Sequence, residues 1–72
     1  MEIQSFIKIF ADAVEIDDVE SLTIDTRFRD LDEWSSLAAM ILVAELEKCG
    51  VKIIGTDIRN CVTIGDIYKL TK

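Results

Sequence analysis

The sequence predicts an all-α fold of four helices, with a long loop between the first two and a short third helix. Apolar residues recur at helical spacing in residues 2–14 and 35–49, and residues 63–66 carry a pattern that starts helices. Ile53-Ile54 is a candidate short strand, but no second strand signal gives it a partner. We expect one domain spanning residues 1–72, because a chain of this length buries a single core.

The first helix is expected from about Glu2 to Val14. Its apolar residues follow the i, i+3, i+4, i+7, i+11 spacing of one helix face, namely Ile3, Phe6, Ile7, Phe10 and Val14. Residues 15–34 show no sustained period and are interrupted by Asp, Ser and Thr, so we expect a loop. A loop of this length needs anchors in a compact domain, and the predicted anchors are Phe28 and Leu31.

The second helix is the best-marked element and is expected to run from Ser35 or Ser36 to about Cys49. Either serine can act as N-cap, and if Ser35 is the cap, the Ser36 hydroxyl is free. At its other end, Gly50 can adopt the left-handed conformation that closes a helix, with Val51 folding back on it.

This second helix carries apolar residues on two opposite faces. At about 100° per residue, one face holds Ala39, Leu42, Val43 and Leu46, and the other holds Leu37, Ile41, Ala44 and Lys48. Four short helices bury only one face of each. We therefore expect the strip Leu37-Ile41-Ala44, with Met40 beside it, to be an exposed docking surface next to Ser36. The alternative is that the long loop folds over this strip and buries it.

Two further helices are expected in the C-terminal third. A short third helix is predicted around residues 56–61, with Thr56 or Asp57 as its cap. The fourth helix follows Thr63-Ile64-Gly65-Asp66, which fits the Ser/Thr-x-x-acid capping pattern, and ends near Thr71.

Charge is distributed unevenly along the chain, whose net charge is −6. Residues 12–33 hold nine acids and two arginines, a balance of 9 − 2 = 7 negative charges, whereas residues 48–72 hold five bases and two acids. The acidic half would repel phosphate backbones and attract basic protein surfaces, so no nucleic-acid binding is expected. An alternative role for the acids is to keep a small apolar domain soluble. Asp30, Asp32 and Glu33 lack the spacing and central glycine of a calcium loop, so no metal site is expected.

Catalysis by the chain itself is not expected. The sequence contains no histidine, and no lysine or cysteine is placed to activate Ser35 or Ser36. Cys49 and Cys61 have no Cys-x-x-Cys spacing and are expected to be buried and reduced. Residues 1–8 do not resemble a signal peptide, and no apolar run reaches the roughly 20 residues of a membrane span. We expect a cytoplasmic monomer that does not insert into membranes.

Four segments together resemble the acyl carrier protein family over nearly the whole chain. They are Thr26-x-Phe28-x-Asp30-Leu31, Ser36-Leu37, Ala44-Glu45-Leu46-Glu47 and Thr63-Ile64-Gly65-Asp66. The resemblance implies a four-helix acyl-carrier-like bundle. It also implies that a separate, Mg²⁺-dependent phosphopantetheinyl transferase attaches a 4′-phosphopantetheine arm from coenzyme A to Ser36. The arm then carries acyl groups as thioesters to partner enzymes of fatty acid, polyketide or related biosynthesis.

This chain departs from the family pattern at two places. Ser35 stands where the family has an aspartate, and the connection from Leu31 to Ser36 is one residue longer than usual. The docking helix is also less acidic than is typical, with Ala38 and Ile41 in it and only Glu45 and Glu47 as acids. The expected docking residues are Leu37, Met40, Ile41, Ala44, Glu45 and Glu47. We expect partner enzymes with basic or apolar patches, and docking that depends less on salt than for a typical fatty-acid carrier.

Several alternatives stay open at the level of sequence. The carried group could be an aminoacyl or peptidyl group, including D-alanyl, or the chain could be a helical adaptor without cofactor. Trp34 is either an anchor of the loop, which is the favoured role, or an aromatic contact beside Ser36. A cavity for an acyl chain would be lined by Leu42, Val43, Leu46, Ile54, Ile58, Val62 and Ile67, although the same residues would serve as a dry core.

Overall fold

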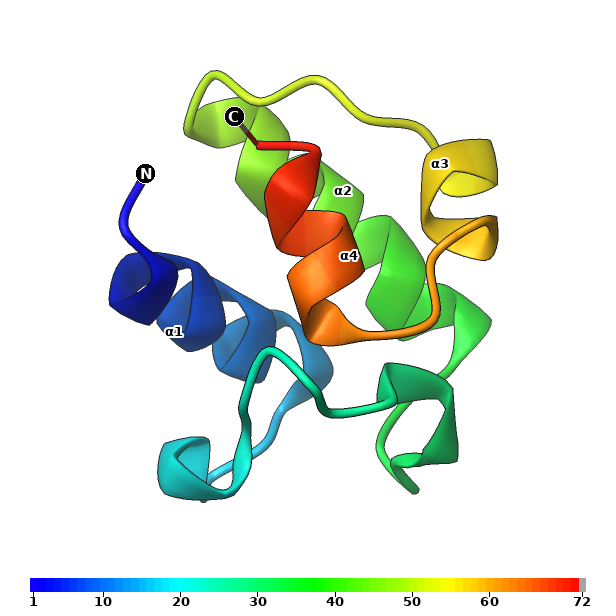
Figure 1. Cartoon of the computed structure of the whole chain (residues 1–72). Coiled ribbons are helices and arrows are strands. Elements are labelled where there is room, and N and C mark those ends of the chain that lie inside the picture. Colours follow the sequence, from blue (N-terminus) through cyan, green and yellow to red (C-terminus); the bar gives the residue numbers. More distant parts are fainter. Residues whose placement is uncertain (72) are drawn as a thin grey trace.

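Four α-helices and two short 3-10 helices make up the regular structure of residues 1–71, which are the residues that this computed structural model describes (Figure 1). In chain order the elements are α1 (Ile3–Val14), η1 (Val19–Ser21), η2 (Phe28–Asp30), α2 (Ser36–Lys48), α3 (Gly55–Arg59) and α4 (Ile64–Lys69). The described residues contain no strand, and their isolated β-bridge joins Arg27 and Thr63. The predicted all-α fold, with its long first loop and short third helix, is confirmed.

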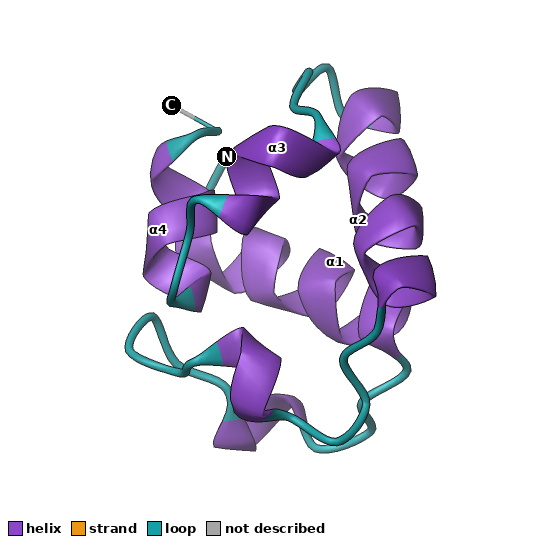
Figure 2. Ribbon diagram, turned by 90° about the vertical axis from the view of Figure 1, so that its right-hand side faces the viewer, coloured by secondary structure: helices purple, strands orange, loops and turns teal. Residues whose placement is uncertain are grey.

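The core lies where α1, α2 and α4 meet. Helix α1 packs against both α2 and α4, and α3 packs against α2 (Figure 2). The apolar face predicted for the first helix points inward, since Phe6 and Phe10 are fully buried. The other large side chains that are fully buried are Phe28, Leu42, Leu46, Ile64 and Ile67. Each helix is too short to be stable alone, so this shared burial is what stabilises them.

The ends of α2 form as the sequence predicts. Ser35 is the N-cap, in extended conformation, and its side-chain oxygen accepts a hydrogen bond from the backbone N–H of Ala38 at 3.1 Å. At the other end Gly50 has a φ of +86°, and the N–H of Val51 donates to the Leu46 carbonyl at 2.9 Å. These bonds satisfy groups that a helix end would otherwise leave without partners.

Apolar side chains anchor the loop between α1 and α2 to the core. Phe28 is fully buried, as predicted, whereas the second predicted anchor, Leu31, is only half-buried. Leu22, which was not predicted, is the other buried residue of the loop, with 5% of its surface exposed.

Residues 24–27 of this loop are also tied to the start of α4. The Ile64 N–H donates to the Thr26 carbonyl at 2.9 Å, and the Gly65 N–H donates to the Ile24 carbonyl at 2.8 Å. A side chain at position 65 would place its Cβ 2.8 Å from the Ile24 carbonyl oxygen, so the close approach requires glycine. The capping box predicted at Thr63 and Asp66 is present beside this contact.

Two sequence predictions about helix ends and burial are wrong. Helix α3 begins at Gly55, with Ile54 as N-cap, rather than at Thr56 or Asp57. Asp57 is instead the third residue of the helix, and its carboxylate accepts the Ile54 N–H at 3.0 Å. Cys49 is exposed because it is the C-cap of α2, while Cys61 is buried as expected.

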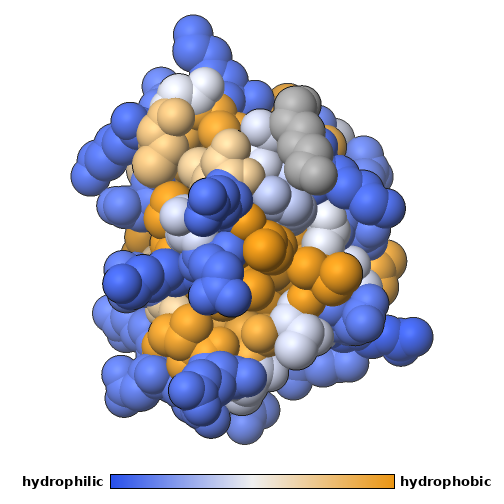
Figure 3. All heavy atoms as spheres, turned by 60° about the vertical axis from the view of Figure 1, so that its left-hand side comes forward, coloured by the Kyte–Doolittle hydropathy of each residue, from blue (hydrophilic) through white to orange (hydrophobic). Residues whose placement is uncertain are grey.

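Exposed apolar side chains are also found away from α2. Ile24, Val62 and Leu70 have 50%, 51% and 40% of their surfaces exposed. On the face that Figure 3 shows, apolar and hydrophilic side chains are interspersed. None of the helices in residues 1–71 is long and apolar enough to cross a membrane.

Candidate functional site

The first turn of α2 presents two serines in different situations. The Ser35 hydroxyl is occupied as the N-cap, whereas Ser36 is the first helical residue, is exposed, and has no side-chain hydrogen bond within the described chain. The backbone N–H groups of Ser36 and Leu37 likewise have no acceptor among residues 1–71. Free N–H groups and the positive end of the helix dipole together favour an anion at this position.

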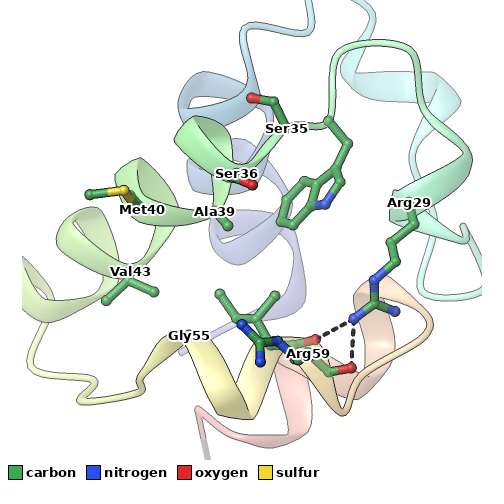
Figure 4. Close-up of a pocket in the computed structure, with 10 residues that line it drawn as sticks. Arg29, Ser35, Ser36, Ala39, Met40, Val43, Gly55 and Arg59 are labelled. Carbon is green, nitrogen blue, oxygen red and sulfur yellow. Dashed lines mark hydrogen bonds between the residues drawn. The ribbon is translucent and has the colours of Figure 1, made fainter.

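A groove of about 610 Å³ opens beside Ser36, between the first turns of α2 and helix α3 (Figure 4). In Figure 4, Ala39, Met40 and Val43 lie along the α2 side, with Gly55 and Arg59 of α3 opposite them. Its apolar lining residues are Trp34, Ala39, Met40, Val43 and Ile58. The groove can therefore hold an apolar group close to the Ser36 hydroxyl.

The seven residues considered as the lining of a cavity or as a dry core divide between the groove, the core and the surface. Of the seven, Val43 and Ile58 line the groove. Leu42, Leu46 and Ile67 are fully buried in the core. Ile54 and Val62 are 63% and 51% exposed on the surface. The periodicity of a helix identifies its inward face, but it cannot distinguish a packed core from the wall of a groove.

Trp34 anchors the loop, which was the favoured role, and it also lies beside Ser36. Its ring stacks on Phe10, with centroids 5.9 Å apart and 5° between the planes, and meets Phe28 edge-on at 4.6 Å. It therefore anchors the end of the loop against the core. The same side chain lines the groove beside Ser36.

Arg29 holds the loop against α3. Its guanidinium donates hydrogen bonds to the backbone carbonyls of Ile58, at 3.0 Å, and of Arg59, at 2.7 Å (Figure 4). It also donates to the backbone carbonyl of Cys61. It lies 4.9 Å from the centre of the Phe28 ring. Carbonyls at the end of a helix lack partners within the helix, so Arg29 both caps α3 and fixes one wall of the groove.

The sequence did not identify Arg29 or Arg59 as groove residues. Their role depends on pairing between the loop and α3, about 30 residues later, for which the sequence contains no local signal. Arg59 forms no ion pair in residues 1–71, where the ion pair present joins Glu45 and Lys48 at 3.3 Å. The groove wall thus carries two cations, Arg29 and Arg59, in a protein whose net charge is −6.

The predicted docking strip is exposed on α2. Leu37, Met40 and Ile41 have 65%, 69% and 37% of their surfaces exposed. Ala44 and Glu47 are exposed as well, and Glu45 is half-buried. The long loop does not cover the strip, so the alternative of a buried strip is wrong. Ala38 does not belong to this surface, because it is 95% buried against the core.

Within residues 1–71, the two groups with shifted pKa values are Cys61 and Asp66, and both lie outside the groove. Burial raises the pKa of the Cys61 thiol, with the nearby Asp66 carboxylate adding to the effect. Backbone N–H groups of Val62 and Thr63 donate to the Asp66 carboxylate and lower its pKa. Asp66 thus belongs to the cap of α4, and the Cys61 thiol donates to the Asp57 carbonyl of α3.

Comparison with known families gives a match over most of the chain. A family model described as a phosphopantetheine attachment site matches residues 4–71. The searches of curated proteins and of solved structures found no match to this chain.

Proposed function

Because this chain belongs to the phosphopantetheine-attachment family, whose domains carry a covalently attached 4′-phosphopantetheine, we propose that it is an acyl carrier protein modified on Ser36. Carrier domains of this family work with a phosphopantetheinyl transferase and with partner enzymes. When bound, the arm supplies a terminal thiol that holds an acyl group as a thioester. The chain's own part is to present the attachment point, shelter the arm and dock partners.

The state of the two serines is the observation that carries the assignment to Ser36. The Ser35 hydroxyl accepts the Ala38 N–H, and its loss as a cap would cost about 1 kcal/mol, so it is committed to the helix. The Ser36 hydroxyl is exposed and makes no competing bond in the described chain. A phosphodiester there would be stabilised by about 0.3–1 kcal/mol at the helix N-terminus.

The residues around Ser36 fit an acyl cargo better than an aminoacyl one. The groove that starts at Ser36 has an apolar wall formed by Trp34, Met40, Val43 and Ile58. No carboxylate lines it among the described residues, so nothing there would pair with the ammonium group of an amino acid. The hypothesis of an adaptor without cofactor is not supported, because the family carries the arm.

The exposed strip of α2 supports docking of partner enzymes beside the attachment point. Leu37, Met40, Ile41 and Ala44 form its apolar part, with Glu45 and Glu47 further along α2. The first two turns of this helix contain no acid, so binding depends more on apolar contact than on charge. A binding constant that falls steeply with ionic strength would contradict this part of the proposal.

The attachment site is tested by intact-mass measurement. The chain is incubated with coenzyme A, Mg²⁺ and a phosphopantetheinyl transferase, alongside Ser36→Ala and Ser35→Ala. We expect one phosphopantetheine increment, retained in Ser35→Ala and lost in Ser36→Ala. An increment that survives in Ser36→Ala refutes the site, and no increment with the transferase of the source organism refutes the carrier function.

The cargo is tested separately on the modified protein. Acyl chains of increasing length are loaded, and the Trp34 fluorescence is recorded, because this side chain lines the groove. Changes that grow with chain length and are absent for aminoacyl groups are expected for an acyl carrier. Identical spectra for both kinds of cargo would remove the basis for preferring acyl groups.

A further inference from the structure

A second, smaller pocket lies on the other side of Ser35, between the end of α1 and the exposed strip of α2. We call it the α1–α2 pocket. It is walled by Ala13 and Val14 of α1 and by Leu37, Ala38 and Ile41 of α2. Ser35 lines both this pocket and the groove, so the attachment point lies next to both hollows.

The size of the α1–α2 pocket suits one aliphatic side chain. Its volume is about 100 Å³. A dry cavity of about 150 Å³ holds a benzene ring, so about 100 Å³ corresponds to roughly four carbon atoms, as in a leucine or isoleucine side chain. The side chains of Val14, Leu37 and Ile41 would give such a group apolar contacts.

Two carboxylates line the same pocket. Glu15 follows α1 and Glu33 precedes α2 in the chain, and both are exposed. Neither forms an ion pair or a side-chain hydrogen bond within residues 1–71. No basic residue among residues 1–71 lines the α1–α2 pocket, so none of them compensates the charge of the two carboxylates there. An apolar pocket flanked by two unpaired acids is complementary to an apolar side chain flanked by bases.

Glu15 is held in a conformation that favours another residue type. It ends α1 with a φ of +62° and a ψ of +44°, the left-handed region that glycine and asparagine enter most easily. The turn it makes is closed by the Ile16 N–H, which donates to the Ala11 carbonyl at 2.9 Å. Glycine would make this turn with less strain, so the glutamate side chain has no folding benefit that would explain it.

We propose that the α1–α2 pocket receives one aliphatic side chain of the phosphopantetheinyl transferase, and that basic groups beside that side chain pair with Glu15 and Glu33. The end of α1 and the loop then supply acidic groups to the docking surface, in addition to Glu45 and Glu47 further along α2. This inference rests on the proposed modification of Ser36.

The transferase is the partner that the geometry selects. It must bring its own active site to the Ser36 hydroxyl, so its surface has to cover the residues around that serine. Enzymes that act on the end of the arm can bind further away. The α1–α2 pocket shares Ser35 with the groove and therefore lies inside the area that the transferase covers.

The test is the steady-state kinetics of modification, with the chain as the varied substrate and the transferase that modifies it in the mass experiment. Glu15→Gln/Glu33→Gln is expected to raise KM roughly three- to tenfold with kcat unchanged, the scale of two exposed ion pairs. Its matched control, Glu2→Gln/Glu20→Gln, changes the net charge equally at exposed acids away from the pocket and should leave KM within about twofold. Equal effects of the two variants would show attraction by net charge alone and would overturn the proposal.

Two further variants address the apolar contact and the fold. Leu37→Ala/Ile41→Ala is expected to raise KM roughly tenfold or more, and Val62→Ala, at a site of similar exposure, serves as the control. Glu15→Gly should raise the midpoint of thermal unfolding by about 3–6 °C and still raise KM, which separates docking from unfolding. Unchanged KM in both Glu15→Gly and Leu37→Ala/Ile41→Ala refutes the α1–α2 pocket while leaving Ser36 modification intact. If the unaltered chain is not modified at all, the proposed function itself is refuted.

Discussion

Replacing each of the two adjacent serines with alanine should have opposite effects on stability and on modification. Ser35→Ala removes the 3.1 Å hydrogen bond to the Ala38 N–H, a cap worth about 1 kcal/mol. At about 2.1 cal/mol/K per residue, 72 residues give an unfolding entropy near 0.15 kcal/mol/K, so Tm falls by about 7 °C. Ser36→Ala removes no intramolecular bond within the described chain and should leave the stability within about 0.5 kcal/mol, because alanine is the better helix former.

The assay is thermal unfolding followed by far-UV circular dichroism, with urea unfolding as an independent measure of the free energy. Ser35→Asp is the matched control, since aspartate also caps a helix and adds a favourable charge at its N-terminus. It should keep the Tm that Ser35→Ala loses. A Tm of Ser35→Ala equal to that of the unaltered chain, or an equal fall in Ser36→Ala, would refute the division of roles between the two serines.

Three other predictions concern the regions that support the site. Arg29→Ala should lower the free energy of unfolding by about 2 kcal/mol and speed hydrogen exchange in α3, because three backbone carbonyls lose their charged donor; Arg29→Lys should recover only part of this. Asp66 has a lowered pKa, so its contribution to stability is present at neutral pH and is lost as the pH falls below the ordinary aspartate value of about 3.9. The difference in Tm between pH 7 and pH 3 should therefore be smaller in Asp66→Asn than in the unaltered chain, and an equal difference would contradict this reasoning. Exposed Cys49 should react with iodoacetamide roughly tenfold or more faster than Cys61, whose thiol is buried and has a raised pKa; peptide mass spectrometry measures both rates, and similar rates would contradict the described burial.

The sequence predicted the parts of the fold that depend on neighbours within about four residues. The limits of α1 and α2, the closing turn at Gly50 and the cap at Thr63 all follow from helical period and capping chemistry, and all are present. Helix α3 was placed less well. It is little more than one turn long, so its start depends on a single contact, in which the Asp57 carboxylate accepts the Ile54 N–H. The sequence does not distinguish an aspartate in this role from an aspartate that is itself the N-cap.

In the loop between α1 and α2, the sequence predicted one buried residue but not the others. Phe28 could be predicted as an anchor because a large aromatic side chain in a polar segment is usually buried in the core. Leu22 and the half-burial of Leu31 could not, because they depend on how the loop crosses the ends of α1 and α4. The hydrogen bonds of Arg29 to α3 likewise depend on a contact between distant parts of the chain.

By itself the sequence determined four helices, an exposed serine at the start of the second, and an apolar strip beside that serine. These features follow from local periodicity and from bonds within one helical turn, which are largely independent of the rest of the molecule. Only the tertiary structure decided that the groove at Ser36 is walled by Trp34, Val43 and Ile58 rather than by the core residues. It alone also brought Glu15 and Glu33 beside Leu37 and Ile41. Pockets are gaps in the packing between separate elements, and their positions depend on how the whole chain packs.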